Sequence, residues 1–322
     1  MIKANESQYR KNVQNSKLVF SKLNEYDKIK QKLLILTRNN RILCLSKRET
    51  DFLKRQIKIL LEKENVILKM KGGTPMAKWV VKAIQVGSIE LDRSAMTHYK
   101  GKGERITVPI WCAGATDGTH KVIVDTGIRD LEEYRKAEPG VRQTPEQVTT
   151  AAIKRIMGWD PEEVEIVINT HLHCDHSGSN REFKNAKFYV QKKEWEAAFA
   201  PLVPEAPFYD RLCYDKSAVN YFQWNFLEGD TEILPGLRVI TTPGHTRGHQ
   251  SVMFDTKDGV VCVSGDICNV AENVNGNLEP NIVVMVPETY QSFERIRQFA
   301  HYILPGHEPA IEDGSEKFIA VL

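Results

Sequence analysis

From residue 79 onward, short apolar runs alternate with turns that contain Gly, Pro or Asn. Runs rich in Val and Ile are typical of strands, and they lie at 79–90, 107–112, 121–124, 164–169, 237–241, 260–263 and 301–304. A segment with Pro and an acidic residue in its first turn predicts a helix at 144–157. A second helix is expected at 287–300. Strands and helices that alternate in this way predict an α/β domain.

Two further segments have a different texture. Residues 192–229 are crowded with aromatic side chains and interrupted by prolines. Such a segment could wall a substrate pocket or close over it as a lid. A small separate core or a dimer interface fits it equally well. Residues 268–281 are polar and are expected to form a loop.

The first cluster of chemically active residues directly follows the predicted strand 164–169, where His171, His173, Asp175 and His176 lie within six positions. Side chains two apart in an extended chain point the same way, so His171 and His173 can bind one ion together. Asp175 and His176 come as the chain turns and face another direction. Imidazole and carboxylate suit zinc-like ions. The alternative is a His-rich surface loop, but the position at a strand end favours a site.

Three more strand ends carry one candidate ligand each. His245 follows strand 237–241, Asp266 follows strand 260–263, and His307 follows strand 301–304. In each case Gly, Pro or Ser turns the chain sharply just before the candidate ligand. Each fragment alone is a weak signal, but the four strand ends together indicate one shared site.

This ordered set of residues resembles the dinuclear metallo-β-lactamase superfamily, from about residue 77 to the C-terminus. The resemblance implies a four-layer αββα sandwich, in which two face-to-face sheets carry helices outside and metals at one edge. It also implies the ligands: His171, His173 and His245 for a first metal, Asp175, His176 and His307 for a second, and Asp266 for both.

The chemistry expected of such a site is ester hydrolysis. Seven protein ligands are too many for one tetrahedral zinc and fit two open sites. The cofactors are therefore expected to be two divalent ions, with Zn²⁺ preferred. A metal-bound hydroxide would attack the ester carbonyl, and Asp175 would move the proton to the leaving oxygen.

Two further residues are expected to orient the metal ligands without binding the metal themselves. Asp125 ends the strand 121–124, and His249 lies four residues after His245. Ligand histidines usually donate their second N–H to such groups, and the superfamily has an Asp and a His at these places. The simpler alternatives are a turn-capping Asp and a solvent-exposed His.

Within the superfamily, Asn169-Thr170, the aromatic segment and the run Thr-Pro-Gly-His-Thr-Arg-Gly-His-Gln-Ser at 242–251 resemble the N-acyl-homoserine lactonases. One position departs from that family. The lactonases carry a Tyr three residues after the bridging Asp, where this chain has Asn269. Asn269 can still donate a hydrogen bond to an oxyanion. Another tyrosine could reach in instead, the candidates being Tyr209, Tyr214 and Tyr221.

The expected function is therefore lactone hydrolysis, with a small-molecule lactone or ester as substrate. A thioesterase of the glyoxalase II type is the alternative enzyme, and it would need basic residues for an anionic glutathione tail. An alternative of another class is a metal-binding sensor or interaction protein with little turnover. A complete ligand set, in which Asp175 can also move a proton, favours an enzyme.

The net charge of +2 conceals an asymmetry. Residues 1–75 carry 18 Lys and Arg against 7 Asp and Glu, whereas residues 76–322 carry 26 against 35. A basic arm can bind nucleic acid, but residues 1–71 lack Gly, Pro, His and Trp and are loaded with residues that AT-rich codons encode. The acidic remainder argues against polyanions. We therefore expect no nucleic-acid partner.

The basic segment ends at Lys71-Gly72-Gly73, followed by Met76. Lys-Gly-Gly can be encoded by AAGGAGG, a bacterial ribosome-binding sequence, at the usual distance from a start codon. We hypothesise that Met76 is the biological start, that residues 1–75 are a translated upstream region, and that residues 76–322 form the hydrolase domain. The alternative is a real basic helical extension. The gene's codons at 71–73 decide between the two.

Cysteine and hydropathy patterns suggest the setting. The six Cys form no Cys-x-x-Cys pair, which favours a reducing cytoplasm. Cys174 lies inside the first cluster, but strand alternation points it away from His171 and His173, so packing is expected for it. No apolar run approaches a membrane span and no signal-peptide pattern opens the chain. A cytoplasmic protein without a membrane partner is expected, and the oligomeric state stays open.

Overall fold

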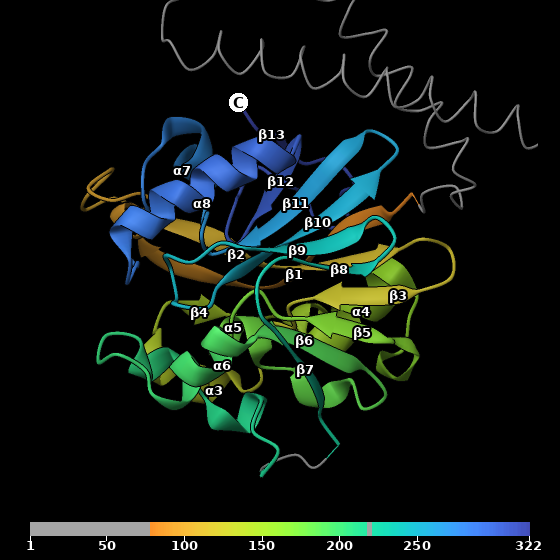
Figure 1. Cartoon of the computed structure of the whole chain (residues 1–322). Helices are drawn as coiled ribbons and strands as arrows, with labels where there is room; N and C mark the ends of the chain where they lie inside the picture. Colours follow the sequence, from red (N-terminus) through yellow and green to blue (C-terminus); the bar gives the residue numbers. More distant parts are fainter. Residues whose placement is uncertain (1–77, 218–220) are drawn as a thin grey trace, which may run out of the picture. The chain divides into compact units, whose positions relative to one another are not determined.

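The computed structural model describes residues 78–217 and 221–322. The predicted extension 1–75 therefore lies outside the described residues. Two β-sheets lie face to face, and helices cover their outer sides (Figure 1). This arrangement is the expected αββα sandwich, and the predicted fold class is confirmed.

The first sheet has seven strands in the order β4-β1-β2-β3-β5-β6-β7. Strands β1 to β3 form an antiparallel meander, whereas β3, β5, β6 and β7 run parallel to one another. The bounds are β1 (Val80–Asp92), β2 (Arg105–Thr116), β3 (Lys121–Val124), β4 (Val141–Arg142), β5 (Ile166–Ile168), β6 (Lys187–Gln191) and β7 (Gln223–Leu227).

The second sheet has six strands in the order β13-β12-β11-β10-β9-β8. Its neighbours pair antiparallel, except for the parallel pair β11 and β12. The bounds are β8 (Thr231–Leu234), β9 (Leu237–Thr241), β10 (Gln250–Thr256), β11 (Gly259–Gly265), β12 (Tyr302–Pro305) and β13 (Ile319–Ala320).

Side-chain alternation along the strands builds the layers. In β10, Val252 and Phe254 face the core between the sheets, whereas Met253 between them faces the opposite side. Successive side chains of a strand point to opposite faces, so a strand with apolar residues at every position can be covered on both sides. The three-residue strand β5 is buried in the same way on both faces.

Helices supply the two outer layers. Helix α4 (Thr149–Met157) packs on the first sheet, together with α3 (Leu131–Ala137) and α6 (Lys192–Phe199). Helices α7 (Ala271–Gly276) and α8 (Val286–Phe299) cover the second sheet. The short helix α5 (Cys174–Ser177) holds part of the predicted ligand loop. None of the described helices has the length and apolar character needed to span a membrane.

The predicted elements agree with the structure in most places. Strands 121–124 and 237–241 have the predicted bounds, and the predicted helix 287–300 is α8, shifted by one residue. The predicted helix 144–157 is divided into a 3-10 turn at Pro145–Gln147 and helix α4, because Val148 between them has ψ 129°, which is not helical.

The predicted loop 268–281 is wrong in one respect, because it contains helix α7. The Asn273 side chain explains the helix. It accepts a hydrogen bond from the Val270 N–H at the helix start and donates to the carbonyls of Met96 and Leu278. A polar residue that caps a helix in this way carries no apolar signal in the sequence.

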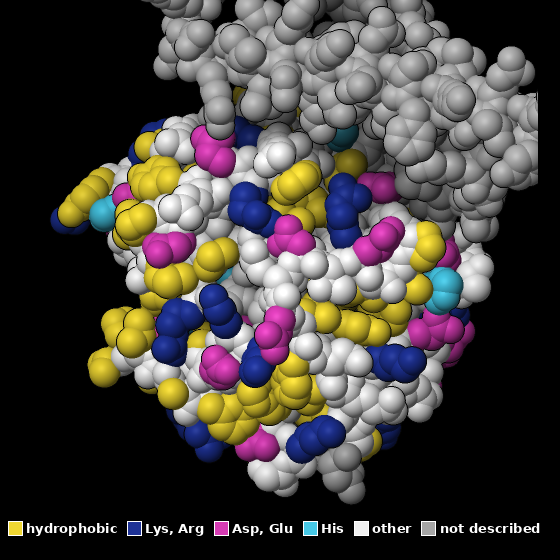
Figure 2. All heavy atoms as spheres, in the orientation of Figure 1, with side chains coloured by type: hydrophobic (Ala, Val, Ile, Leu, Met, Phe, Trp, Pro, Cys, Tyr) yellow, Lys and Arg dark blue, Asp and Glu magenta, His cyan; other side chains and the backbone are white. Residues whose placement is uncertain are grey.

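The aromatic segment 192–229 is largely an extension of the core beside the first sheet. Tyr214 and Phe222 are buried, and Trp195 and Trp224 pack against the same cluster. Phe226 on the edge strand β7 is 45% exposed, and Figure 2 shows apolar side chains gathered over α6 and β7. Positive and negative side chains are interspersed on the face in that view.

Candidate metal centre

The predicted ligand residues meet at one edge of the two sheets. Strand β5 is parallel to β3, so Asp125 and His171 follow strand ends that lie side by side. In the second sheet, β9, β11 and β12 run in one direction. Their carboxyl ends therefore bring His245, Asp266 and His307 to the same edge.

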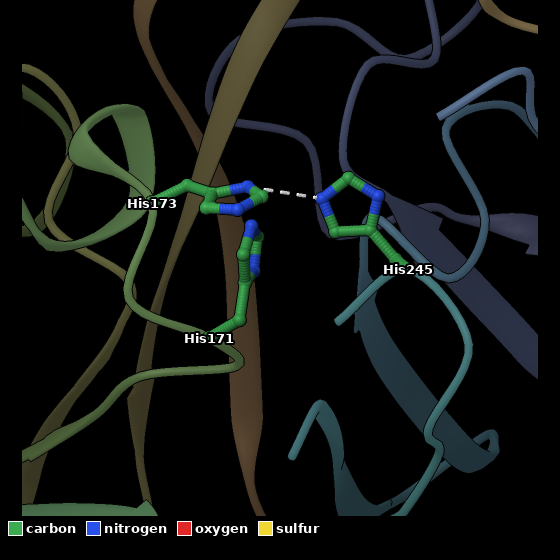
Figure 3. A group of neighbouring side chains, drawn as sticks. All are labelled: His171, His173 and His245. Atoms are coloured by element: carbon green, nitrogen blue, oxygen red, sulfur yellow. Dashed lines mark hydrogen bonds between the residues drawn. The ribbon is translucent and has the colours of Figure 1, made fainter. Parts of the chain in front are cut away.

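The first group consists of His171, His173 and His245 (Figure 3). Their ring centroids lie 4.6 to 4.9 Å apart, and His245 Nε2 is 3.1 Å from His173 Nδ1. All three are buried. His171 and His173 come from one loop and His245 from another, as Figure 3 shows.

The second group consists of Asp175, His176, Asp266 and His307. His176 Nε2 lies 3.2 Å from Asp266 Oδ1 and 3.7 Å from Asp175 Oδ2. His307 Nε2 lies 3.3 Å from Asp266 Oδ2. The same Oδ2 atom is 3.7 Å from His245 Nε2 in the first group. Asp266 therefore stands between the two groups.

The second ring nitrogen of four of these histidines is held by the protein. His245 Nδ1 donates to the Ile282 carbonyl and His307 Nδ1 to the Pro109 carbonyl, both over 2.8 Å. His176 Nδ1 is 2.8 Å from Asp125 Oδ2, and His171 Nδ1 is 3.0 Å from Thr170 Oγ1. Such bonds orient a ring and leave its Nε2 free to face the centre, as in metal-binding histidines.

Several polar side-chain atoms of the two groups lack a hydrogen-bond partner. Among the described residues, the Nε2 atoms of His171, His173 and His176 and Oδ1 of Asp266 are buried without a hydrogen bond. Buried polar atoms are almost always paired, so a cluster of unpaired nitrogen and oxygen atoms is unusual. Nitrogen and carboxylate donors in these numbers fit divalent ions of the zinc type.

Burial and neighbouring charges set the protonation states of the side chains in the two groups. Burial, followed by repulsion from His176, holds the pKa of His171 well below its ordinary value. Burial also lowers the pKa of His173 strongly. Burial alone would raise the pKa of Asp266, but His176 and His307 outweigh it and hold that pKa well below the usual range. The first group therefore has neutral imidazoles, with lone pairs available to a metal.

Asp125 lies directly behind His176. It is 2% exposed, and it accepts hydrogen bonds from the backbone N–H and the hydroxyl of Thr170, both over 2.7 Å. Burial raises its pKa, although the nearby His176 works against the shift. Asp125 thus joins His176 to Thr170, which itself contacts His171.

His249 is fully buried, so it is not a solvent-exposed residue. Its ring lies 5.2 Å from the His171 ring, and its Nδ1 is 3.0 Å from Thr242 Oγ1. It belongs to neither ligand group. Its position beside His171 fits support by packing, without a hydrogen bond to a ligand.

The residues expected to contact the substrate differ in whether their polar side-chain atoms already have hydrogen-bond partners. Asn269 is 3% exposed, and its side-chain Oδ1 is buried without a partner among the described residues. Its carbonyl accepts the His307 N–H over 2.8 Å. The hydroxyls of the three candidate tyrosines are already engaged: Tyr209 donates to Glu194, Tyr214 to the Ala198 carbonyl and Tyr221 to the Arg181 carbonyl.

A cavity of about 370 Å³ borders the metal-ligand loop. Cys174 and Tyr209 line it on the side of that loop, and the Tyr209 ring packs against His173 with centroids 4.7 Å apart. Tyr134 on α3 lines it from the opposite element. Cys174 is in neither ligand group and packs against the core, as predicted, although it begins helix α5 and does not lie in an extended segment.

Tyr134 is a candidate that the sequence did not indicate. It is buried; burial, then the negative charge of Asp175, raises its pKa well above the ordinary value. Its hydroxyl is therefore a neutral donor beside Asp175. No motif surrounds it, and the short helix α3 was not predicted. A single buried Tyr on a short polar helix gives no periodic signal to find it by.

Comparison with known proteins identifies relatives of this arrangement. The model of the metallo-beta-lactamase superfamily matches residues 109–308. An N-acyl homoserine lactonase of Bacillus cereus is 30% identical over 200 residues, which cover 59% of this chain and 76% of the relative. The N-acyl homoserine lactonase AttM of Azorhizobium caulinodans is 30% identical over 166 residues, which cover 48% and 62%.

Solved structures have the same fold. A quorum-quenching N-acyl homoserine lactone hydrolase superposes with a TM-score of 0.63 at 25% identity, covering 77% of this chain and all of the other. An N-acyl homoserine lactone hydrolase with N-hexanoyl-L-homoserine bound at its catalytic metal centre gives 0.64 at 24% identity, covering 76% of this chain and all of the other. By the family match and its fold, the chain belongs to the metallo-beta-lactamase superfamily.

Proposed function

We propose that this protein is a metal-dependent lactonase that opens the ring of N-acyl homoserine lactones or lactones of similar build. The observation that carries the proposal is the position of Asp266, which is in contact distance of His245 and His307 and so joins two buried groups of side chains that could hold metal ions. The relatives named as N-acyl homoserine lactonases support the substrate class.

Seven residues would hold two divalent ions, for which Zn²⁺ is the expected choice. One ion would take the three imidazoles of the first group, and the other would take Asp175, His176 and His307, with Asp266 between the two. Divalent ions held there would supply a water of lowered pKa and would polarise an ester carbonyl.

Asp175 is suited to move the proton of the reaction. It lies at the start of α5, is 5% exposed and faces His176 and Asp266. We infer that its carboxylate takes the proton of the attacking water and delivers it to the ring oxygen that leaves as an alcohol. This transfer balances the hydrolysis, since the carboxylate is regenerated at the end.

Two side chains are placed to bind the substrate's oxygens. Asn269 is buried, its backbone carbonyl accepts the His307 N–H, and its side-chain amide carries N–H donors. The Tyr134 hydroxyl, whose pKa is raised by burial and then by the charge of Asp175, offers another donor. We infer that these groups share the contact with the carbonyl oxygen that develops negative charge. The three tyrosines of the aromatic segment are not available for it without losing their present hydrogen bonds.

The cavity beside Cys174 would receive the acyl group. Its charged lining is balanced, with three cations (Arg129, Lys136 and Arg211) and three carboxylates (Asp130, Glu133 and Asp210). Arg129 already donates two hydrogen bonds to Asp210. A cation that is paired in this way is poorly placed to bind an anionic tail. The cavity therefore favours a neutral acyl chain over the anionic glutathione moiety that the thioesterase alternative requires.

A substrate panel tests the proposal. The full chain, loaded with Zn²⁺, is offered an N-acyl homoserine lactone, a simple aryl ester and a glutathione thioester, and proton release is followed at constant pH. We expect ring opening of the lactone to have the highest kcat/KM. Turnover of the thioester alone would contradict the lactonase proposal.

A further inference from the structure

Glu194 is a buried carboxylate with no part in either ligand group. It lies in the first turn of α6 and is fully buried. Buried carboxylates are costly unless hydrogen bonds satisfy them. Its sequence surroundings, between two lysines and a tryptophan, indicate no special role.

Four hydrogen-bond donors surround the Glu194 carboxylate. Oε1 accepts from the Leu172 N–H and from the Tyr209 hydroxyl, both over 3.0 Å. Oε2 accepts from the Thr246 hydroxyl over 2.6 Å and from the Gly248 N–H over 3.2 Å. Each oxygen thus accepts two hydrogen bonds, and every partner is a donor.

Three of these partners belong to the two loops that carry the first histidine group, and the fourth, Tyr209, lies in the aromatic segment. Leu172 stands between His171 and His173, whereas Thr246 directly follows His245. The loops come from different sheets, and one oxygen of Glu194 holds each loop. The fit is tight, since a Cβ at Gly248 would lie 1.9 Å from the Glu194 amide nitrogen.

We propose that Glu194 is a positioning residue, which sets the distance between His245 and the pair His171 and His173. This role rests on the proposed metal centre. Because all four partners donate, only a carboxylate can accept from them all. In Glu194→Gln the amide nitrogen must face a donor, so at least one loop loses its anchor.

The effect should be confined to one ion. Glu194 makes none of its hydrogen bonds with the second group. That group is oriented from elsewhere, by Asp125 behind His176 and by the Pro109 carbonyl behind His307. A general loss of structure would instead weaken both ions together.

The test is a Co²⁺ titration of the metal-free full chain, followed by visible absorption and a competing chelator. We expect Glu194→Gln to bind one ion roughly 10–100-fold more weakly, the range for groups that orient metal ligands, and the second ion with unchanged affinity. Asp117→Asn is the matched control. This carboxylate also accepts several hydrogen bonds, but within the β2–β3 turn, and its loss should change neither affinity.

Two milder variants test the same role if Glu194→Gln does not fold. Thr246→Val removes the shortest of the four bonds and should weaken the same ion, whereas Thr246→Ser keeps the hydroxyl and should restore its affinity. Wild-type affinities in both Glu194→Gln and Thr246→Val, or equal weakening of both ions, would overturn the role of Glu194. A wild-type chain that binds no metal would overturn the proposed metal centre as well.

Discussion

Asp266 is the residue on which the proposed centre depends most. Its two oxygens lie within 3.2 to 3.7 Å of the Nε2 atoms of His176, His245 and His307. Asp266→Asn keeps the shape of the side chain but removes the negative charge that would lie between two cations. We expect metal content and kcat/KM to fall together, as measured by metal analysis of dialysed protein and by lactone hydrolysis.

The stability of the metal-free protein separates this effect from misfolding. Removing the charge also removes the attraction that raises the pKa of His307, but it leaves the apolar cores untouched. The metal-free Asp266→Asn variant should therefore unfold at about the same urea concentration as the metal-free wild type. If both ions stayed bound at wild-type affinity, the bridging position of Asp266 would be refuted.

Asp125 provides a second residue-scale prediction. Its backbone has φ 58°, a left-handed conformation that Asn tolerates and Ala resists. Asp125→Asn therefore isolates the loss of charge behind His176, with little added strain. We expect roughly 10–100-fold weaker binding of the ion that His176 would hold, as measured by chelator competition. Unchanged affinity would count against this supporting role.

The release of a proton on metal binding provides a third residue-scale prediction. Burial alone would lower the pKa of His176, but the charges of Asp266, Asp175 and Asp125 outweigh it and raise that pKa well above its ordinary value. His176 therefore carries a proton near neutral pH in the metal-free protein, and an incoming ion must displace it. Metal affinity should fall as pH falls, and calorimetry in buffers of different ionisation enthalpy should detect protons released on binding.

At the scale of elements, helix α3 forms one wall of the cavity. Ala137 lines it at the end of α3 and is not one of the predicted ligands. Ala137→Trp should fill much of the space, and we expect KM to rise for a long-chain acyl lactone with little change in kcat. A lactone without an acyl chain is the control and should be unaffected. Equal effects on both substrates would place the acyl group elsewhere.

The elements also show what the sequence could predict. Strand ends at His171, His245, Asp266 and His307 were predictable because β-branched runs precede them and sharp turns follow. Helix α3 and strand β6 were not predicted, since both are short and mostly polar at one face. Glu194 and Tyr134 were missed because their roles depend on contacts with residues distant in the chain.

At the scale of the whole molecule, the site exists only because two sheets meet. The first sheet supplies Asp125 and the loop 170–178, and the second supplies His245, Asp266 and His307. Strand order within each sheet arises from pairing between distant segments, such as β1 with β4. No local pattern encodes that order, so the resemblance to a known family carried the prediction of the layers.

We propose that hydrolysis needs two ions held by these seven residues. The most direct measurement is lactone hydrolysis during stepwise addition of Zn²⁺ to the metal-free full chain, with bound metal counted at each step. We predict that kcat/KM rises until about two ions are bound per chain and then stays constant. Full activity with one ion, or in the absence of metal, would refute a two-ion centre.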